Sequence, residues 1–247
     1  MKKIMESLRE IKSAGKIVYL TKPEPNKEFL QSLENRTASA FIDVLLSEAD
    51  KKTASEIIAR TAKKVGIKTS YILNHTVDTL VSTEGTILPL METVFDVLDK
   101  KASGEITLKA AEKLGMNIFD GYVKEKVTEW TTKTWTETIA RFVFNPQGTG
   151  IVFSEISKDR IVAHVIKCPT PGRAGKAPHL TCPFSYGYAR GLWKKAFLEG
   201  EVLMGGTMAH GAPTCGFTFY VKADKEHAEM REKIKRYLTK EEEMKLL

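Results

Sequence analysis

The segment Cys182–Val221 places the tightest constraint on how this 247-residue chain can fold. Within it, Gly187 and Gly191 stand four residues apart, so on a helix they share one face. Glycines on a shared face let a second backbone approach closely, because no Cβ atom keeps it away. Pro183 suits the first turn of such a helix, where its missing N–H has no intrahelical partner to lose. The segment therefore predicts a glycine-spaced helix over residues 183–198.

Alternating apolar residues predict an antiparallel sheet around this helix. The expected strands cover residues 151–156, 160–168, 201–209 and 215–222, with a turn at 210–214 and a further short apolar run at 16–21. Before residue 135, apolar side chains instead recur at helical spacing. The expected fold class is therefore α+β, with a helical N-terminal half followed by an antiparallel sheet and the glycine-spaced signature helix. The expected regions are a mainly helical part over 1–104, an α+β domain over 105–222 and a charged C-terminal helix over 223–247.

Two segments of the helical half, residues 50–67 and 99–116, are weakly similar. Both begin with Asp-Lys-Lys, and both end with a glycine followed by an apolar residue. Two helical hairpins of common origin would explain the similarity, and so would the ordinary composition of charged helices.

The formal net charge of +7 suits an anionic ligand, an acidic partner or nucleic acid. The lysines, however, alternate with glutamates along the expected helices, and faces of mixed sign are usually solvated. Residues 62–72 fit part of a helix-turn-helix template, but Thr61 and His75 stand where that template needs apolar residues. A helix that ends at glycine explains this pattern without DNA, so a nucleic-acid partner is not expected.

The cellular compartment can be inferred from the apolar runs and the cysteines. No apolar run approaches the roughly 20 residues of a membrane-spanning helix, and the N-terminus lacks the apolar segment of a signal peptide. Three cysteines in a chain of this length fit a reducing compartment, where thiols are free or metal-bound. We therefore expect a cytoplasmic protein with no membrane segment.

Specific residues of the segment resemble a known signature. The pattern consists of Cys182, Gly187, Tyr188, Ala189 and Gly191, followed by Thr207, Gly211, Cys215 and Phe217. It resembles the C-terminal signature of vinyl-reductase-type (4-vinyl reductase) small-molecule-binding domains, over about residues 105–222. That resemblance implies a helical half and an antiparallel sheet that enclose an apolar pocket, often in a homodimer.

One position departs from that family. Its sensor members carry a zinc-binding cysteine eight residues before the last one, where this chain has Thr207. In this respect the chain is similar to the L-2-amino-thiazoline-4-carboxylic acid hydrolase-like family, in which a threonine commonly occupies this place. Because a shared fold does not fix function, both relationships stay open.

A small-molecule pocket is the first functional hypothesis. Large apolar side chains would form its wall and a few polar groups would orient the guest. The expected apolar lining residues are Phe184, Tyr188, Trp193, Met204, Met208, Phe217 and Phe219, and the expected polar groups are Tyr186, Thr207 and His210. Ordinary core packing explains the same residues.

A zinc site is the second hypothesis. His179, Cys182, His210 and Cys215 are four zinc-type ligands on two separate elements, as a tetrahedral site requires. By resemblance to the sensors, Glu155 with the two cysteines is an alternative ligand set. The alternative to any metal is that both cysteines are buried packing residues and both histidines lie in loops.

A nucleophilic thiol is the third hypothesis. At a helix N-terminus, Cys182 would feel the positive end of the helix dipole, which lowers a thiol pKa. His179 or His210 would act as the base, and Thr207 or a backbone N–H would stabilise a developing oxyanion. Such a site suits hydrolysis of a non-peptide C–N bond in a cyclic amidine, and a helix-capping structural cysteine is the alternative.

The sequence therefore predicts a protein that binds a small apolar or aromatic molecule. The alternative is a hydrolase of a cyclic amidine, such as a thiazoline carboxylate, that uses Cys182 or a bound metal.

Overall fold

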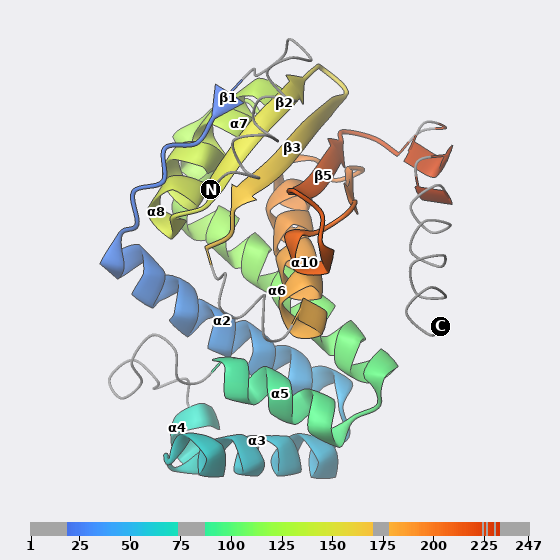
Figure 1. Ribbon diagram of the computed structural model, residues 1–247. Coiled ribbons are helices and arrows are strands. Elements are labelled where there is room, and N and C mark those ends of the chain that lie inside the picture. The colour runs from blue at the N-terminus through green and yellow to red at the C-terminus, as the bar shows by residue number, and fades with distance from the viewer. Residues whose placement is uncertain are drawn as a thin grey trace.

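The computed structural model describes residues 19–73, 87–169, 178–223, 225, 227–229 and 231–232. Figure 1 shows a sheet at one end of the molecule and α2, α3 and α5 at the other, with α6 and α10 running between them. Most of the expected C-terminal helix, the residues around His75 and the side chain of His179 lie outside the described part of the chain.

The described N-terminal half is helical, as its apolar spacing predicts. Its helices are α2 (Lys27–Glu48), α3 (Lys51–Val65), α4 (Thr69–Leu73), α5 (Ile87–Val97) and α6 (Lys100–Tyr122). Asp50 and Asp99 begin the two similar segments, and each carboxylate accepts hydrogen bonds from two backbone N–H groups of the helix that follows. The shared Asp-Lys-Lys therefore marks a helix N-cap in both places. Gly66 ends α3 with a left-handed φ of 76°, a conformation that glycine adopts easily.

A π-helix connects the helical half to the sheet. After η2 (Lys124–Lys126), the chain passes through α7 (Thr132–Ile139), the π-helix η3 (Ala140–Phe144) and α8 (Asn145–Gln147) without a break. Such π-helical turns are rare in proteins, and those that do occur are often found at functional sites.

The strands form one antiparallel sheet, which together with the helices confirms the α+β class. They are β1 (Tyr19–Leu20), β2 (Gly150–Ile156), β3 (Arg160–Lys167), β4 (Glu201–Met204) and β5 (Cys215–Tyr220), in the spatial order β1-β2-β3-β5-β4. All four pairings are antiparallel. β4 is shorter than expected, because a 3₁₀ turn, η4 (Met208–His210), replaces the second half of the predicted strand. Gly211 closes that turn with a φ of 89°.

The signature helix begins earlier than the sequence indicates. α10 covers Pro178–Ala196, so Pro183 lies inside the helix and Cys182 is not at its N-terminus. The glycine spacing allows the predicted close backbone contact, because Gly187 and Gly191 face α6. A Cβ atom added at Gly187 would lie 2.6 Å from the carbonyl oxygen of Leu108. An added Cβ at Gly191 would collide with the carbonyl oxygen of Glu112 on the same helix.

Two apolar clusters fill the interior. One surrounds the sheet and contains Trp135 and Trp193, whose ring centroids lie 4.9 Å apart at an interplanar angle of 85°. The other joins α2, α3 and α5 around Phe41. Helix α6 contributes Ala110 to the second cluster and Ala111 to the first. The boundary expected between residues 104 and 105 thus falls inside a helix that serves both clusters.

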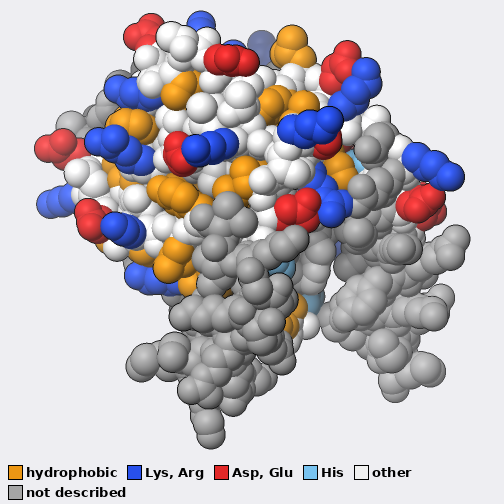
Figure 2. Space-filling model, turned by 90° about the horizontal axis from the view of Figure 1, so that it is seen from above, with side chains coloured by type: hydrophobic (Ala, Val, Ile, Leu, Met, Phe, Trp, Pro, Cys, Tyr) orange, Lys and Arg blue, Asp and Glu red, His pale blue; other side chains and the backbone are white. Residues whose placement is uncertain are grey.

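The surface carries charges of both signs. Figure 2 shows Lys and Arg interspersed with Asp and Glu on the face viewed from above. Lys64, in one of the lysine-rich stretches, lies 2.9 Å from Asp96 of α5. Among the described residues, no helix is both long and apolar enough to cross a membrane.

Candidate ligand-binding cavity

A cavity of about 790 Å³ lies between the helices and the sheet, within the size range of small-molecule sites. The helical half contributes the apolar side chains Leu30, Leu33, Ile87, Leu88, Met91 and Leu114 to its wall. The later half contributes Phe144, Ile151, Phe153, Ala163, Val165, Phe184, Ala189, Met204, Met208, Phe217 and Phe219. Helices α2 and α5 therefore face the sheet and α10 across a mainly apolar space.

The predicted pocket residues divide into two groups. Tyr188, Met204, Met208, Phe217, Phe184, Phe219 and Thr207 line the cavity. Tyr186, Trp193 and His210 do not line it. The hydroxyl of Tyr186 donates to the carbonyl oxygen of Val202 at 3.0 Å, which ties α10 to β4. Trp193 is fully buried, and its indole N–H donates to the carbonyl oxygen of Tyr220 at 2.8 Å.

All three cysteines of the chain meet at this cavity. Cys168 follows β3, Cys182 lies on α10 and Cys215 begins β5, and each is a half-buried cysteine in the cavity wall that forms no disulfide. Burial raises the pKa of Cys182, because a thiolate loses solvation there, and it raises the pKa of Cys215 for the same reason. The expectation that Cys182 stands at a helix N-terminus, where the dipole would lower its pKa, is wrong, because α10 already begins at Pro178.

The three residues expected to be catalytic lie in contact. The Cys182 sulfur is 3.9 Å from Oγ1 of Thr207, and that oxygen is 2.7 Å from Nδ1 of His210. The turn η4 creates this arrangement, since it places Thr207 and His210 three residues apart on one tight bend. The thiol and the hydroxyl line the cavity, whereas the His210 side chain is exposed.

The predicted metal ligands are only partly brought together. The part of the chain that the structure describes contains no group of three or more His, Cys, Asp or Glu side chains arranged to hold a metal ion. Cys215 accepts a hydrogen bond from the backbone N–H of Met208 at 3.3 Å, while His210 contacts Thr207. Glu155 forms an ion pair with Arg160 at 2.7 Å, toward the other end of the β2–β3 hairpin. A zinc site therefore stays a prediction, for which the described residues form no set of ligands.

Among the described residues, two side chains of the cavity wall have a buried hydroxyl with no hydrogen-bond partner. They are Tyr188, which is 7% exposed, and Thr149, which is 5% exposed. Sequence patterns gave no indication of Thr149, nor of the residues from α2 and α5, since nothing in the helical half suggested that it faces a ligand. Phe144, on the π-helix, was missed for a similar reason, because its apolar spacing is that of an ordinary helix.

Comparison with known proteins adds little to the geometry. No family model matches the chain, and no curated protein sequence matches it. Among solved structures, a mutant of the Fe(II) unliganded H-NOX protein from K. algicida is similar, with a TM-score of 0.46 and 11% sequence identity. The similarity covers 77% of this chain and 97% of that one.

Proposed function

We propose that this protein binds a small, mainly apolar molecule in the cavity between α2, α5, α10 and the sheet. The observation that carries the proposal is the cavity itself, with about 790 Å³ of space and a predominantly apolar wall. Protein interiors are normally packed with few voids larger than a water molecule. An apolar space of this size is typical of small-molecule binding sites, and this supports the proposal. The resemblance to vinyl-reductase-type domains supports the same proposal.

The decisive experiment fills the cavity. Met208 lies half-buried in the turn η4 and lines the cavity, so Met208→Trp would fill part of the ligand space. Met116 on α6 is also half-buried but does not line the cavity, which makes Met116→Trp a matched control. We expect aromatic and aliphatic compounds to raise the melting temperature of the parent protein and of Met116→Trp, but not of Met208→Trp. Failure of every compound to stabilise the parent protein would refute the proposal.

Two further parts of the proposal rest on the sequence. The family resemblance supports a homodimer, which sedimentation equilibrium would test against a monomer of 27.6 kDa. That none of the three cysteines forms a disulfide supports a reducing, cytoplasmic location.

A hydrolase is the second candidate, and the contact among Cys182, Thr207 and His210 favours it. In such a site the Thr207 hydroxyl would pass the thiol proton to His210 while the Cys182 sulfur forms a bond to the amidine carbon, and the π pair of the C=N bond moves to the ring nitrogen, which takes the proton from His210. The ring C–N bond would then break, and water would displace the Cys182 thiol to release the ring-opened product. The raised pKa of Cys182 makes this relay necessary, because little thiolate exists before the proton leaves.

The hydrolase proposal is tested with 2-amino-thiazoline-4-carboxylate as substrate. Cys182→Ala should abolish turnover, whereas Cys168→Ala removes another cavity thiol that is outside the Thr207–His210 contact and should retain it. Equal turnover by the parent protein and Cys182→Ala would refute the proposal.

A further inference from the structure

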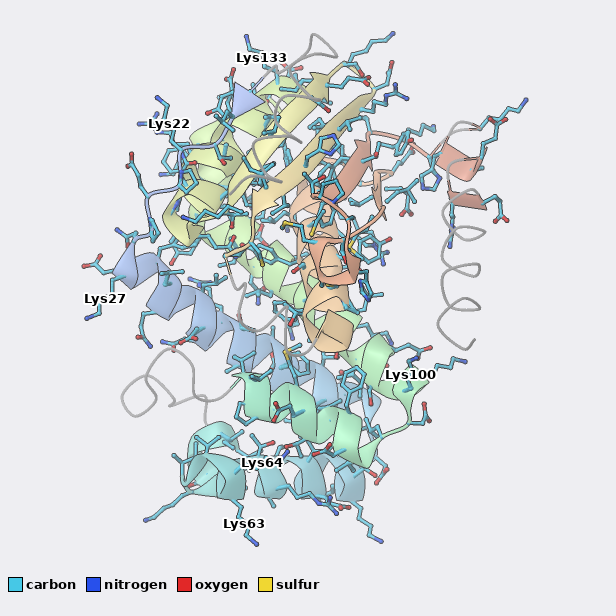
Figure 3. The ribbon with its side chains drawn as sticks, viewed as in Figure 1. Lys22, Lys27, Lys63, Lys64, Lys100 and Lys133 are labelled. Atoms are coloured by element: carbon cyan, nitrogen blue, oxygen red, sulfur yellow. The ribbon has the colours of Figure 1, made fainter. Side chains whose placement is uncertain are left out.

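Sulfur-bearing side chains gather at one corner of the cavity, where β4, η4 and β5 meet α10. They are Cys182 of α10, Met204 of β4, Met208 of η4 and Cys215 of β5, and we call these four residues the sulfur corner. All four line the cavity and are half-buried, so an ion can reach them from the open space. In Figure 3, several sulfur atoms, drawn in yellow, lie around the junction of β5 and α10.

Two contacts bring the thiols of the sulfur corner to the same turn. The Cys182 sulfur lies 3.9 Å from Oγ1 of Thr207. The backbone N–H of the next residue, Met208, donates to the Cys215 sulfur at 3.3 Å. The two sulfurs therefore contact consecutive residues of the chain. A negative charge on Cys182 would also raise the pKa of Cys215, as is expected of neighbouring thiols.

The strand register brings the thioethers to the same place. Met204 lies opposite Phe217 in the β4–β5 pair, and both residues line the cavity, so they share the inner face of the sheet. Cys215 lines the cavity two residues before Phe217, which makes it a diagonal neighbour of Met204, within reach of a long side chain. Met208 follows in η4, beside the Cys215 sulfur. Because methionine is unbranched and flexible, both thioethers can turn toward the thiols.

The chemistry of these donors selects a soft metal ion. Among the residues that the structure describes, His, Cys, Asp and Glu side chains form no group of three or more that could hold a metal ion, so a tetrahedral Zn²⁺ lacks its usual ligands. Thiolate and thioether sulfurs are instead the donors that suit Cu(I). We propose that the sulfur corner binds one Cu(I) ion through its two thiols and its two thioethers. This site goes beyond the apolar guest proposed above and does not depend on it.

Binding exchanges thiol protons for the ion. Burial raises the pKa of Cys182 and of Cys215, so both thiols carry their protons near neutral pH. Each S–H bond that gives way to an S–Cu bond releases one proton to the solvent, and copper stays Cu(I) throughout, so no oxidant or reductant is needed. The N–H of Met208 at the Cys215 sulfur stabilises the thiolate that forms. The affinity for Cu(I) should therefore rise with pH.

The test measures Cu(I) binding to the full chain in the absence of oxygen, in competition with the coloured chelator bathocuproine disulfonate. We expect one Cu(I) per chain. Cys182→Ser and Cys215→Ser should each weaken binding by at least about tenfold, because even groups outside the ligand set change metal affinity by roughly that factor. The double variant Met204→Leu, Met208→Leu removes both thioethers at nearly constant volume and should weaken binding by at least about tenfold as well.

Two variants of the same cavity wall serve as matched controls. Met91→Leu removes a thioether of α5, which faces the sulfur corner from the helical half. Cys168→Ser removes the thiol that follows β3. Both variants should bind Cu(I) as tightly as the parent protein, because neither residue belongs to the sulfur corner.

Three results would overturn the inference. The first is Cu(I) binding by the parent protein that is no tighter than binding by the variant without both thiols. The second is unchanged affinity in Met204→Leu, Met208→Leu, which excludes the thioethers as ligands and decides the matter even if the cysteine variants do not fold. The third is an equal loss in Met91→Leu or Cys168→Ser, which places the ion elsewhere. Stabilisation of the parent protein by apolar compounds is measured separately, so the proposed binding function stands or fails independently of these results.

Discussion

Replacing Gly191 by alanine tests the close packing of α10 against α6. The added Cβ would collide with the carbonyl oxygen of Glu112 and lie 2.9 Å from Cα of Gly115. Both obstacles are backbone atoms, so no side chain can rotate away and the helices must separate. Overpacking of this kind costs about 3 kcal/mol at the upper end of its usual range, and the better helix propensity of alanine returns about 1 kcal/mol. The expected net loss is about 2 kcal/mol.

The assay is urea denaturation followed by circular dichroism, together with the melting temperature. For a chain of this length, a loss of about 2 kcal/mol lowers the melting temperature by about 4–8 °C. Gly104→Ala is the matched control, since Gly104 lies on α6 with nothing within 4 Å of an added Cβ. It should stabilise the protein by about 0.5–1 kcal/mol through helix propensity alone. If Gly191→Ala also stabilises the protein, the close approach described for α6 and α10 is wrong.

Three further predictions concern charge and pH. Burial lowers the pKa of His164 below the value of about 6.5 in the unfolded chain, so the free energy of unfolding is highest above that pH and falls as the pH drops below it. In His164→Gln, the free energy of unfolding should change less between pH 7 and pH 5 than in the parent protein. Burial raises the pKa of Cys182 and of Cys215, so the two thiols contribute fully to stability below about pH 8.5, the value in the unfolded chain, and this contribution is lost as the pH rises through their pKa in the folded protein. Between pH 8 and pH 10, the variant with both cysteines replaced by alanine should therefore lose less stability than the parent protein. Glu112→Gln should destabilise the protein by about 1.5–3 kcal/mol in urea, because that carboxylate, only 18% exposed, pairs with two cations of α10. Glu199→Gln, from an ion pair that is largely exposed, should change stability by less than about 1 kcal/mol.

The fold class could be predicted because the apolar period changes from helical spacing to alternation near residue 150, and returns to helical spacing for α10. Both periods reflect which side chains face a core. In the structure, helices occupy most of the chain before residue 135, and strands follow residue 150. The spacing of Gly187 and Gly191 was equally informative, since only a close backbone contact requires two glycines on one helical face.

Element boundaries were less predictable, for reasons that involve distant contacts. Pro183 removes a single intrahelical hydrogen bond, and α10 extends back through Pro178, with Thr181 and Cys182 in the cavity wall. The end of β4 lies at two glycines, whose backbones still bond to Gly216 at 2.9 and 3.1 Å. After these glycines the chain forms η4 instead of a strand, although apolar and polar residues still alternate in the sequence there.

The cavity could be predicted only from one side. Aromatic and thioether side chains after residue 180 suggested a pocket, and several of them line it. The opposite wall comes from α2 and α5, where Leu30 and Met91 look like the apolar stripe of any amphipathic helix. Which stripe faces another helix and which faces a ligand is decided by tertiary packing, and spacing does not encode it.

The pairing of β1 with β2 has a consequence for the order of folding. Thr21 donates to the carbonyl oxygen of Thr149 at 3.0 Å and accepts from the N–H of Ile151 at 2.7 Å, across 128 and 130 residues. The helices from α2 to α7 form the loop that these bonds close, and each helix can begin from local contacts before closure. The cavity wall is complete only when β5, more than 60 residues later, has joined β3. On a ribosome, therefore, the cavity forms only after nearly the whole described chain has emerged, and ligand binding would report the last step of folding.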